Sequence, residues 1–339
     1  MSKKNSNVNL KNKFENFKDL SKIYLNFKKK ITLLKRKSFL VAVSGGPDSL
    51  ALAALIKTYS YEKKIKPHYV LIDHNIRKNS SKEARQVKSL LKKKQINLHI
   101  LINKMAIKKN IQSNARNIRY ELLGNYCKIN KLRVVLTAHN LEDQVETFFI
   151  RLSRGSGLTG LSSMKPLSDL KNNIKLCRPL LDAKKKDLIK ISKLTFGKYF
   201  NDPSNKNKKY LRTKIRDLKK PLSKSGIDYE QIIKSINNLA SSKETLDEYF
   251  NKIFRDTVKK QKNKISINLK KFHNFNEEIR MMLINKSIKV LKKNYYNPRS
   301  KKVINLIKEI ENYKYLKSTL GGCIISKKSN ILYLTKEKK

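Results

Sequence analysis

The sequence predicts an α/β fold with a doubly wound parallel sheet, followed by a helical domain and a small α+β C-terminal region. Apolar segments typical of buried strands alternate with helix-forming segments through the first half of the chain. The first two of these strands begin about thirty residues apart, a spacing that is typical of a βαβ unit. Polar residues follow three of the predicted strands, at the edge of the sheet where such folds bind their ligands. One functional site is therefore expected at that edge.

The individual elements follow from hydrophobic spacing and turn residues. Near-helical spacing of Phe14, Phe17, Tyr24, Phe27 and Ile31 predicts an amphipathic helix in a lysine-rich N-terminal extension. Strands are expected at residues 39–43, 68–75, 96–102, 133–139 and 174–181, with short ones around 321–322 and at 331–335. Helices are expected at 49–56, after a Ser80-x-x-Glu83 capping box, and at 111–129, 141–152, 184–196, 229–293 and 300–312, with a flexible loop at 154–160. The predicted domains are an extension (1–37), an α/β domain (38–220), a helical domain (221–297) and a C-terminal region (298–339).

The central motif is Ser44-Gly45-Gly46-Pro47-Asp48-Ser49, which lies between a predicted buried strand and an apolar helix. Glycines let the backbone turn sharply and approach a ligand, and proline is tolerated in the first turn of a helix. The free N–H groups and partial positive charge of such a helix start favour phosphate. The motif is not the common P-loop, because no Lys-Ser or Lys-Thr pair closes it. Asp48 suits either a Mg²⁺ ligand or a helix cap, and a plain strand–turn–helix corner is the alternative interpretation.

Charge and composition limit the class of partner. The chain has 79 Lys and Arg against 26 Asp and Glu, a formal net charge of +53, which favours a polyanionic partner. The alternative is a compositional bias towards lysine, so the scattered arginines are the more informative residues. Cys127, Cys177 and Cys323 form no CxxC motif, which is consistent with a reducing cytosol and argues against a disulfide framework. No apolar run approaches the length of a membrane span or a secretory leader, so a cytoplasmic protein without a membrane is expected.

Three further clusters carry polar residues that suit chemistry. Asp73 and His74 end the second predicted strand, where they suit adenine or ribose, or simply a polar strand end. Arg116 and Arg119 share a helix face, which suits phosphate or carboxylate recognition, or a solvated surface. The segment 137–147 contains Asp143, in the first turn of a helix. Its carboxylate either stabilises that positive end or holds the Mg²⁺ of a leaving pyrophosphate.

These motifs together resemble the tRNA(Ile)-lysidine synthases, which are PP-loop ATP pyrophosphatases. The resemblance covers residues 35–220, and it rests on the hexapeptide, Asp73-His74-x-x-Arg77, Ala115-Arg116-x-x-Arg119-Tyr120, Thr137-Ala138-His139 to Thr147, Arg154-Gly155-Ser156-Gly157, Arg178-Pro179-Leu180-Leu181 and Asp202-Pro203-Ser204-Asn205. Glu142 stands where the family usually has Asp, and Arg212-Thr213 replaces an Arg-Asn pair. These departures affect the expected tRNA contacts more than ATP activation.

The resemblance implies an activity and a set of site residues. ATP and Mg²⁺ would adenylate the wobble cytidine of tRNA(Ile) with a CAU anticodon, and the amine of free L-lysine would then displace AMP. The implied ATP-binding residues are Ser44, Gly45, Gly46, Pro47, Asp48, Ser49, Asp73 and His74, with Asp48 and Asp143 as catalytic and Mg²⁺-binding residues. The implied substrate-binding residues are Arg77, Arg116, Arg119, His139, Glu146, Arg151, Arg154, Arg212 and Arg216.

Two alternatives and the oligomeric state stay open at this point. A tRNA thiolase on the same ATP loop is the nearest alternative, although thiolases usually need cysteine pairs or an iron–sulfur cluster. A non-catalytic RNA-binding protein with a relic loop is the second alternative. The sequence leaves a homodimer open.

Overall fold

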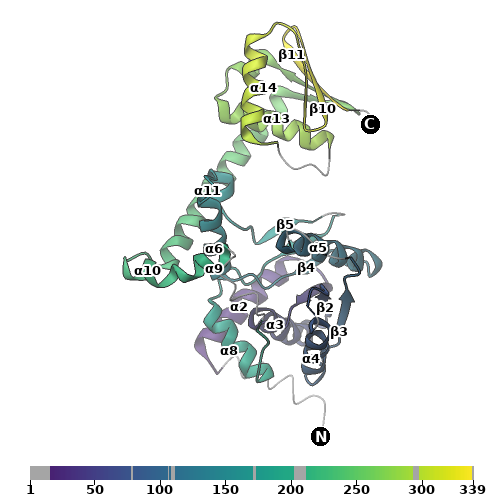
Figure 1. The fold of residues 1–339 in the computed structure, drawn as a ribbon, viewed down its shortest axis with the longest axis vertical. Coiled ribbons are helices and arrows are strands. Elements are labelled where there is room, and N and C mark those ends of the chain that lie inside the picture. Colours follow the sequence, from purple (N-terminus) through teal and green to yellow (C-terminus); the bar gives the residue numbers. More distant parts are fainter. Residues whose placement is uncertain are drawn as a thin grey trace. The chain divides into compact units, whose positions relative to one another are not determined.

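The computed structural model describes residues 16–77, 79–105, 107, 111–170, 173–201, 211–292 and 298–337. The chain forms two compact units, Met1–Ala240 and Ser241–Lys339, each with its own hydrophobic core. Figure 1 shows both units, and helix α11 (Tyr229–Thr257) contributes to each of them. The domain boundaries expected at residues 37, 220 and 297 stay predictions.

The first unit is built on a six-stranded sheet in the order β3-β2-β1-β4-β6-β5. The parallel strands are β1 (Ser38–Val43), β2 (Lys66–Asp73), β3 (Leu98–Ile102), β4 (Val134–Leu136) and β6 (Lys175–Cys177), and β5 (Leu167–Asp169) is antiparallel. In the centre, Val41 pairs with Tyr69 on one side and Leu136 on the other. The predicted doubly wound α/β fold is confirmed. Because the chain winds outward from β1 in both directions, a crevice opens between the carboxyl ends of β1 and β4.

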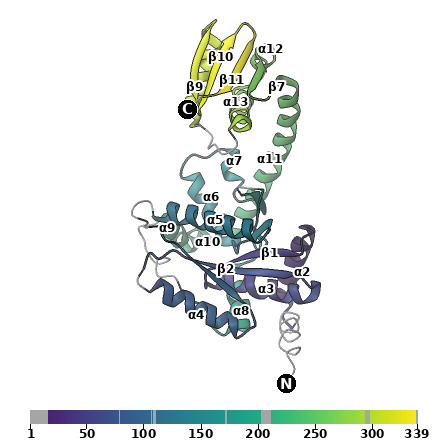
Figure 2. The same cartoon turned by 90° about the vertical axis from the view of Figure 1, so that its right-hand side faces the viewer.

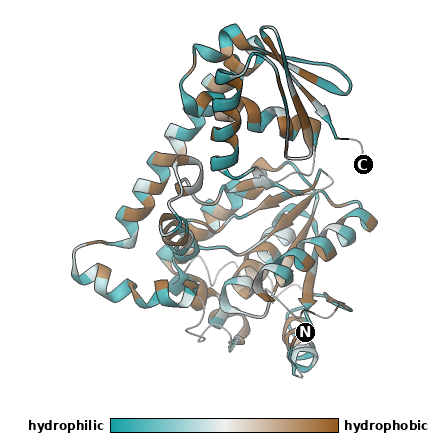
Figure 3. Cartoon of the chain, turned by 45° about the horizontal axis from the view of Figure 1, so that its top comes forward, coloured by the Kyte–Doolittle hydropathy of each residue, from teal (hydrophilic) through white to brown (hydrophobic). Residues whose placement is uncertain are grey.

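Helices cover both faces of this sheet, as Figure 2 shows. One face carries α2 (Lys18–Leu33), α3 (Pro47–Lys63), α4 (Ser80–Lys92) and α8 (Lys185–Phe196), and the other carries α5 (Ile111–Ile129). Every residue from 50 to 56 in α3 is fully buried. This explains the unbroken apolar block in the sequence, because α3 lies between the sheet and α8. Figure 3 shows the strands of this unit mostly in brown, the colour of hydrophobic residues.

The remaining helices of the first unit follow the last two parallel strands. They are α6 (Leu141–Leu152), α7 (Leu158–Leu161), α9 (Leu211–Asp217), α10 (Lys219–Lys224) and the first part of α11. Leu141 and Val145 of α6 pack on Ile232 and Ile236 of α11 in a small separate core. The motif at 202–205, which forms part of the resemblance, lies outside the described residues.

Four details differ from the predictions for this unit. Ser80 is the first residue of α4 rather than its cap, and the preceding Asn79 makes no side-chain capping bond. The strands β4 and β6 are each three residues long, since the chain leaves the sheet early to build the turns that hold polar groups. Within the expected loop at 154–160, the backbone begins the short helix α7 at Leu158. In α2, Leu20 is buried and Phe17 is exposed.

The second unit has an antiparallel sheet in the order β7-β8-β11-β10-β9, with helices packed on it. Its elements are β7 (Val258–Lys260), β8 (Lys264–Asn268), α12 (Leu269–His273), α13 (Glu277–Leu291), α14 (Ser300–Asn312), β9 (Leu316–Leu320), β10 (Cys323–Lys328) and β11 (Ile331–Lys336). The prediction of helix throughout 229–293 is wrong at β7 and β8. Ile265 and Ile267 are buried on either side of the less buried Ser266, a period of two that favours a strand.

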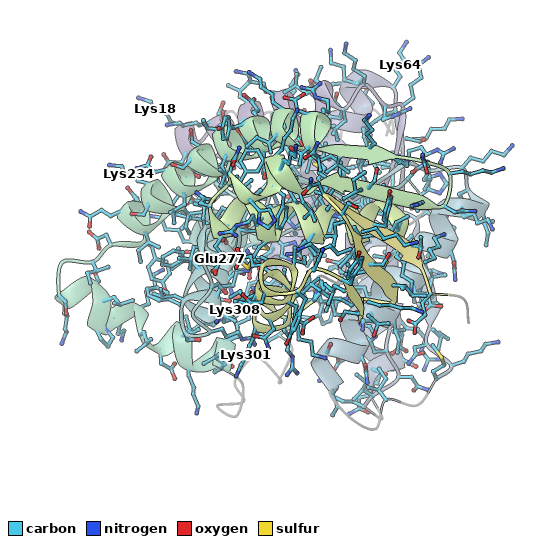
Figure 4. All side chains as sticks on the ribbon, turned by 90° about the horizontal axis from the view of Figure 1, so that it is seen from above. Lys18, Lys64, Lys234, Glu277, Lys301 and Lys308 are labelled. Atoms are coloured by element: carbon cyan, nitrogen blue, oxygen red, sulfur yellow. The ribbon has the colours of Figure 1, made fainter. Side chains whose placement is uncertain are left out.

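The excess of lysine is spread over the surface of both units. Figure 4 shows Lys18, Lys64 and Lys234 of the first unit extending outward from the ribbon. Lys301 and Lys308 on α14 are likewise exposed. This even distribution agrees with a compositional bias as one source of the charge. Among the described residues, no helix is long and apolar enough to cross a membrane.

Candidate active site

The predicted phosphate loop joins β1 to α3 and is closed by its own hydroxyl groups. The Ser49 hydroxyl accepts a hydrogen bond from the Ser44 N–H at 3.1 Å and donates to the Gly46 carbonyl at 3.0 Å. Pro47 is the first residue of α3, and Gly46 at the N-cap provides no side-chain cap. The positive end of α3 is therefore left for another group, which is the arrangement that an anion requires.

Gly45 fixes the path of this loop. Its φ of +84° lies in the region that favours glycine, and its carbonyl accepts a 3.0 Å hydrogen bond from the Phe200 N–H. A Cβ atom at Gly45 would lie 2.6 Å from Cγ2 of Val87 in α4. Both the backbone angle and the close packing therefore require glycine at this position.

Asp48 brings a carboxylate to the start of α3. Its Oδ1 atom is buried and has no hydrogen-bond partner among the described residues. The pKa of Asp48 is raised to about 6, mainly by burial and in addition by the charge of Asp143. The charge of Lys185 and a hydrogen bond with Asn140 act in the opposite direction. A buried carboxylate with one unpartnered oxygen that faces a second carboxylate is a site that a cation stabilises.

Asn140 and Asp143 form the corresponding turn at the end of β4. The Asn140 side chain accepts from the Asp143 N–H at 2.9 Å, and the Asp143 carboxylate accepts from the Asn140 N–H at 3.1 Å. This reciprocal pair is a capping box at the start of α6. Asp143 also forms an ion pair of 3.3 Å with Arg212. Asp143 therefore caps the helix through Oδ2, while its Oδ1 pairs with Arg212, and its role as a Mg²⁺ ligand stays a prediction.

The residues at the crevice fit Mg²⁺ better than a fully protein-coordinated metal. The described residues contain no group of three or more His, Cys, Asp or Glu arranged to hold a metal ion. Mg²⁺ typically takes one or two carboxylates and fills its other positions with water and substrate phosphate oxygens. Asp48 and Asp143 are the two carboxylates available here, and the unpartnered Oδ1 of Asp48 is a free ligand atom.

Glu146, one turn further along α6, is a buried anchor for two arginines. Its side chain is 3% exposed and accepts from Nε of both Arg212 and Arg216 at 2.6 Å. A buried carboxylate needs such pairing, and removing one partner would leave an uncompensated charge. The predicted substrate contacts Glu146, Arg212 and Arg216 are therefore brought together, with Glu146 holding the arginine side chains of α9 beside Asp143.

Lys185 and Glu142 also lie at the site, and no sequence motif marks Lys185. The Lys185 N–H at the start of α8 donates to Glu142 Oε2 at 2.9 Å, and the Leu141 N–H donates to the Ala183 carbonyl at 3.0 Å. These bonds join the N-termini of α6 and α8. The charge of Lys185 makes the largest electrostatic contribution that favours ionised Asp48. In the run Lys184-Lys185-Lys186 of a lysine-rich chain, nothing local distinguishes the middle residue.

Asp73 organises the turn after β2. Its oxygens accept from the Asn75 N–H at 2.9 Å and the Ser81 hydroxyl at 2.6 Å. Burial alone would raise the pKa of Asp73. The hydrogen bonds that its carboxylate accepts, first of all the one from Ser81, outweigh this effect, so the pKa lies below its usual value. Arg77 forms an exposed ion pair with Glu83 of α4 at 3.0 Å. These contacts direct the side chains of Asp73 and Arg77 towards the turn and α4. Both ring nitrogens of His74 are buried, and neither has a hydrogen-bond partner among the described residues.

His139 lies among arginines. Its Nδ1 is 3.0 Å from the Thr137 hydroxyl. The pKa of His139 is lowered to about 3, mainly by burial. The charges of four arginines lower it as well, in decreasing order Arg178, Arg116, Arg212 and Arg119. The ring is therefore neutral near pH 7. Arg178 opens the Arg178-Pro179-Leu180-Leu181 motif, although the resemblance did not imply a role for it.

The loop after α6 is tied back to that helix. Arg151 donates through Nη1 to the carbonyls of Gly160 at 2.6 Å and Ser163 at 2.9 Å. The buried Gln144 side chain pairs with both backbone polar groups of Met164. Arg151 is thereby engaged with the loop, whereas Arg154 is exposed.

The raised pKa of Asp48 predicts a pH-dependent stability of the metal-free protein. The folded pKa of about 6 exceeds the unfolded value of 3.8, so protonation stabilises the fold below about pH 4, and this contribution is lost as pH rises through 6. At pH 8 in EDTA, Asp48→Asn should raise the free energy of unfolding by up to about 3 kcal/mol, at about 1.4 kcal/mol per pKa unit. At pH 4 the two proteins should match in urea unfolding, and an equal difference at both pH values would contradict the assignment.

Comparison with known proteins shows the family of this chain. A family model described as a PP-loop domain matches residues 16–221. The tRNA(Ile)-lysidine synthase of Wolbachia pipientis wMel is 36% identical over 302 residues, covering 88% of this chain and 70% of that protein. The Rickettsia typhi protein of the same name is 32% identical over 304 residues, covering 88% of this chain and 69% of its own length.

Among solved structures, the U34-tRNA thiolase NcsA from Methanococcus maripaludis, which carries a [4Fe-4S] cluster, superimposes with a TM-score of 0.54. It is 19% identical and covers 66% of this chain and 78% of that one, a likeness that extends to the fold alone. The PP-loop match and the relatives that align over 88% of this chain lead to one conclusion. This chain belongs to the tRNA(Ile)-lysidine synthase family and contains its PP-loop domain.

Proposed function

We propose that this chain uses ATP to join L-lysine to C2 of the wobble cytidine of tRNA(Ile) with a CAU anticodon, releasing AMP and pyrophosphate. The observation that carries the proposal is the convergence of Asp48, Asn140 and Asp143 at the uncapped start of α3. In the first step the C2 oxygen attacks the α-phosphorus of ATP, and pyrophosphate leaves. In the second step an amine of lysine attacks C2, and AMP leaves with the oxygen.

The residues of the crevice would support the first step by position and charge. The start of α3 and its loop would hold pyrophosphate, and Asp48 and Asp143 would hold Mg²⁺, which when bound neutralises the charge of the leaving group. Arg212, fixed by Glu146 and Asp143, would face the developing charge. The target cytosine lies in a single-stranded loop, where an unstacked base can enter a pocket. The proposed setting is the cytoplasm, and a homodimer stays a prediction.

Lys185 is expected to supply the cation that the phosphate loop lacks. Lys185→Gln should raise the KM for ATP about tenfold or more and weaken inhibition by added pyrophosphate, because a charged hydrogen bond contributes about 1.5–3 kcal/mol. Lys186→Gln is the matched control, since it removes the same charge from the neighbouring, exposed residue of α8. Steady-state kinetics of AMP formation would compare the two. Equal effects of the two substitutions would contradict the role of Lys185.

The positions of the cysteines disfavour the thiolase alternative. Cys127, Cys177 and Cys323 are all buried, and they lie in three different hydrophobic cores. Burial raises the pKa of Cys127 and Cys177 to about 11, which disfavours the thiolate that sulfur transfer needs. Sulfur relay or cluster ligation would require thiols that meet at the site.

A cysteine-free variant tests this choice. The protein with all three cysteines replaced by alanine should still join labelled lysine to tRNA, with a loss of stability from the cavities that it leaves. Melting curves would confirm that the variant is folded at the assay temperature. A folded variant that has lost lysine transfer would contradict the proposed function. A non-catalytic RNA-binding protein, the other alternative, would form no AMP in the same assay.

A further inference from the structure

Helix α8 begins in an unfavourable electrostatic setting. Its N-cap residue is Lys184, which makes no side-chain capping bond, and Lys185 and Lys186 are its first two residues. The N-terminus of a helix carries a partial positive charge, so lysines at this end are unfavourable. Glu230 pairs with Lys184, and Asp187 lies in the first turn, where burial raises the pKa of its carboxyl. The start of α8 therefore depends on an acceptor from another element.

Glu142 of α6 supplies this acceptor. Its Oε2 atom accepts the Lys185 N–H at 2.9 Å, and its side chain is only 15% exposed. The first N–H groups of a helix have no partner within that helix, so a carboxylate that accepts one of them caps it. The other oxygen, Oε1, lies 3.5 Å from Nζ of the exposed Lys219. One carboxylate thus joins α6 to α8 and offsets positive charge at the start of α8.

The length of the Glu142 side chain matters, because a separate bond fixes the distance between the two helix starts. The Leu141 N–H donates to the Ala183 carbonyl at 3.0 Å, and these residues lie just before Glu142 and Lys185 in the chain. With the two backbones held in this way, a glutamate side chain reaches the Lys185 N–H. Aspartate is one methylene group shorter, so it would leave this N–H without its cap.

The backbone at the start of α8 also determines where the side chain of Lys185 can reach. Among the charges that act on Asp48, that of Lys185 favours the ionised carboxylate most, which places its ammonium group near the phosphate loop. A lysine side chain is long and has many rotamers, so its ammonium is held in one place only if its backbone is fixed. Since α8 packs against α3, a shift at the start of α8 would move this ammonium relative to the loop.

We propose that Glu142 is a positioning residue, which caps the start of α8 at Lys185 and thereby holds the Lys185 ammonium beside the phosphate loop. The inference rests on the role of Lys185 in the proposed function. In this role Glu142 needs no contact with ATP or tRNA, because it acts through the backbone of Lys185. The effect of changing Glu142 on ATP binding should therefore depend on the presence of the lysine side chain at position 185.

The test measures the Kd for ATP by calorimetry with Mg²⁺, without tRNA or lysine, so it does not depend on lysidine formation. Glu142→Asp should raise the Kd about fivefold, the factor that corresponds to one capping hydrogen bond. Glu142→Gln keeps an acceptor oxygen at the same reach and should stay within about twofold of the wild type, because the exposed pair with Lys219 contributes little. Lys185→Gln should raise the Kd about tenfold. In that background, Glu142→Asp should have no further effect.

Asp187→Asn is the matched control, because it removes a carboxylate from the first turn of α8 and leaves the bond to Glu142 in place. Its Kd for ATP should equal that of the wild type. Melting curves of all variants would show that each is folded at the temperature of the titration.

Three results would overturn the inference. The first is an unchanged Kd in Glu142→Asp, and the second is an equal increase from this substitution with and without Lys185. The third is equal weakening by Glu142→Gln and Glu142→Asp, which would assign the effect to charge rather than to the cap. A wild-type protein that shows the expected ATP-binding pattern but forms no lysidine would support the inference and contradict the proposed function.

Discussion

Replacing Asp143 by Asn is expected to lower the rate of AMP formation by about 10²–10³-fold, because it removes one of the two carboxylates at the crevice and one of the two ion pairs of Arg212. The fold should survive, because an asparagine side chain can still accept the Asn140 N–H bond of the capping box. We expect a stability change within about 1 kcal/mol. Pre-steady-state measurement of AMP release with saturating ATP and tRNA, beside a urea titration, would give both quantities.

The matched control for this substitution is Asp169→Asn. Asp169 is an exposed carboxylate of β5 that pairs with Lys175, so the change in net charge is the same and the site is untouched. Raising Mg²⁺ should partly restore Asp143→Asn and have no effect on the control. Normal AMP formation in Asp143→Asn would remove this residue from the proposed mechanism.

Gly45→Ala is expected to cause the largest loss of stability of any single change in the phosphate loop. The left-handed φ of +84° costs a residue with a Cβ about 1–2 kcal/mol, and the 2.6 Å approach to Val87 adds about 1–3 kcal/mol. The expected decrease in the free energy of unfolding is therefore about 2–5 kcal/mol. Chemical denaturation with an unchanged m-value would measure it.

Two further substitutions separate the cost of the left-handed backbone at Gly45 from the cost of the close contact with Val87. Gly46→Ala should change stability little, because the φ of Gly46 is −70° and the nearest atom to its Cβ would be Ser44 Oγ at 3.6 Å. Val87→Ala should cost less in the Gly45→Ala background than in the wild type, because it removes the overlap. Strict additivity of the two substitutions would show that the close contact with Val87 is not the cause.

Much of the fold was predictable because its signals are local. The bounds of α5, α6 and α14 match the expected ranges, since each helix has a continuous apolar stripe and clear ends. The hexapeptide after β1 and the polar residues after β4 could also be assigned to the site, because ligands bind beyond the carboxyl ends of the strands in a parallel sheet. The hairpin of β7 and β8 was missed because its period of two covers few residues between long helical patterns.

The contacts of the site were less predictable because they are tertiary. The approach of Lys185 to Asp48 depends on how α8 packs beside α3 and α6. The depth of Arg178 depends on β6 and on the loop that carries Lys165. The sequence also could not show that Glu146 is used by two arginines, or that Arg151 is bound to the loop carbonyls. Each of these depends on a partner far along the chain.

The most direct test of the central claim is mass spectrometry of the tRNA product. The protein would be incubated with ATP, Mg²⁺, L-lysine and a tRNA(Ile) transcript with a CAU anticodon, and the tRNA then digested to nucleosides. Our account predicts one cytidine, at the wobble position, with a mass increased by lysine less one water. Without lysine it predicts an AMP adduct on the same nucleotide. Unmodified cytidine in both reactions, or sulfur in the product nucleoside, would contradict it.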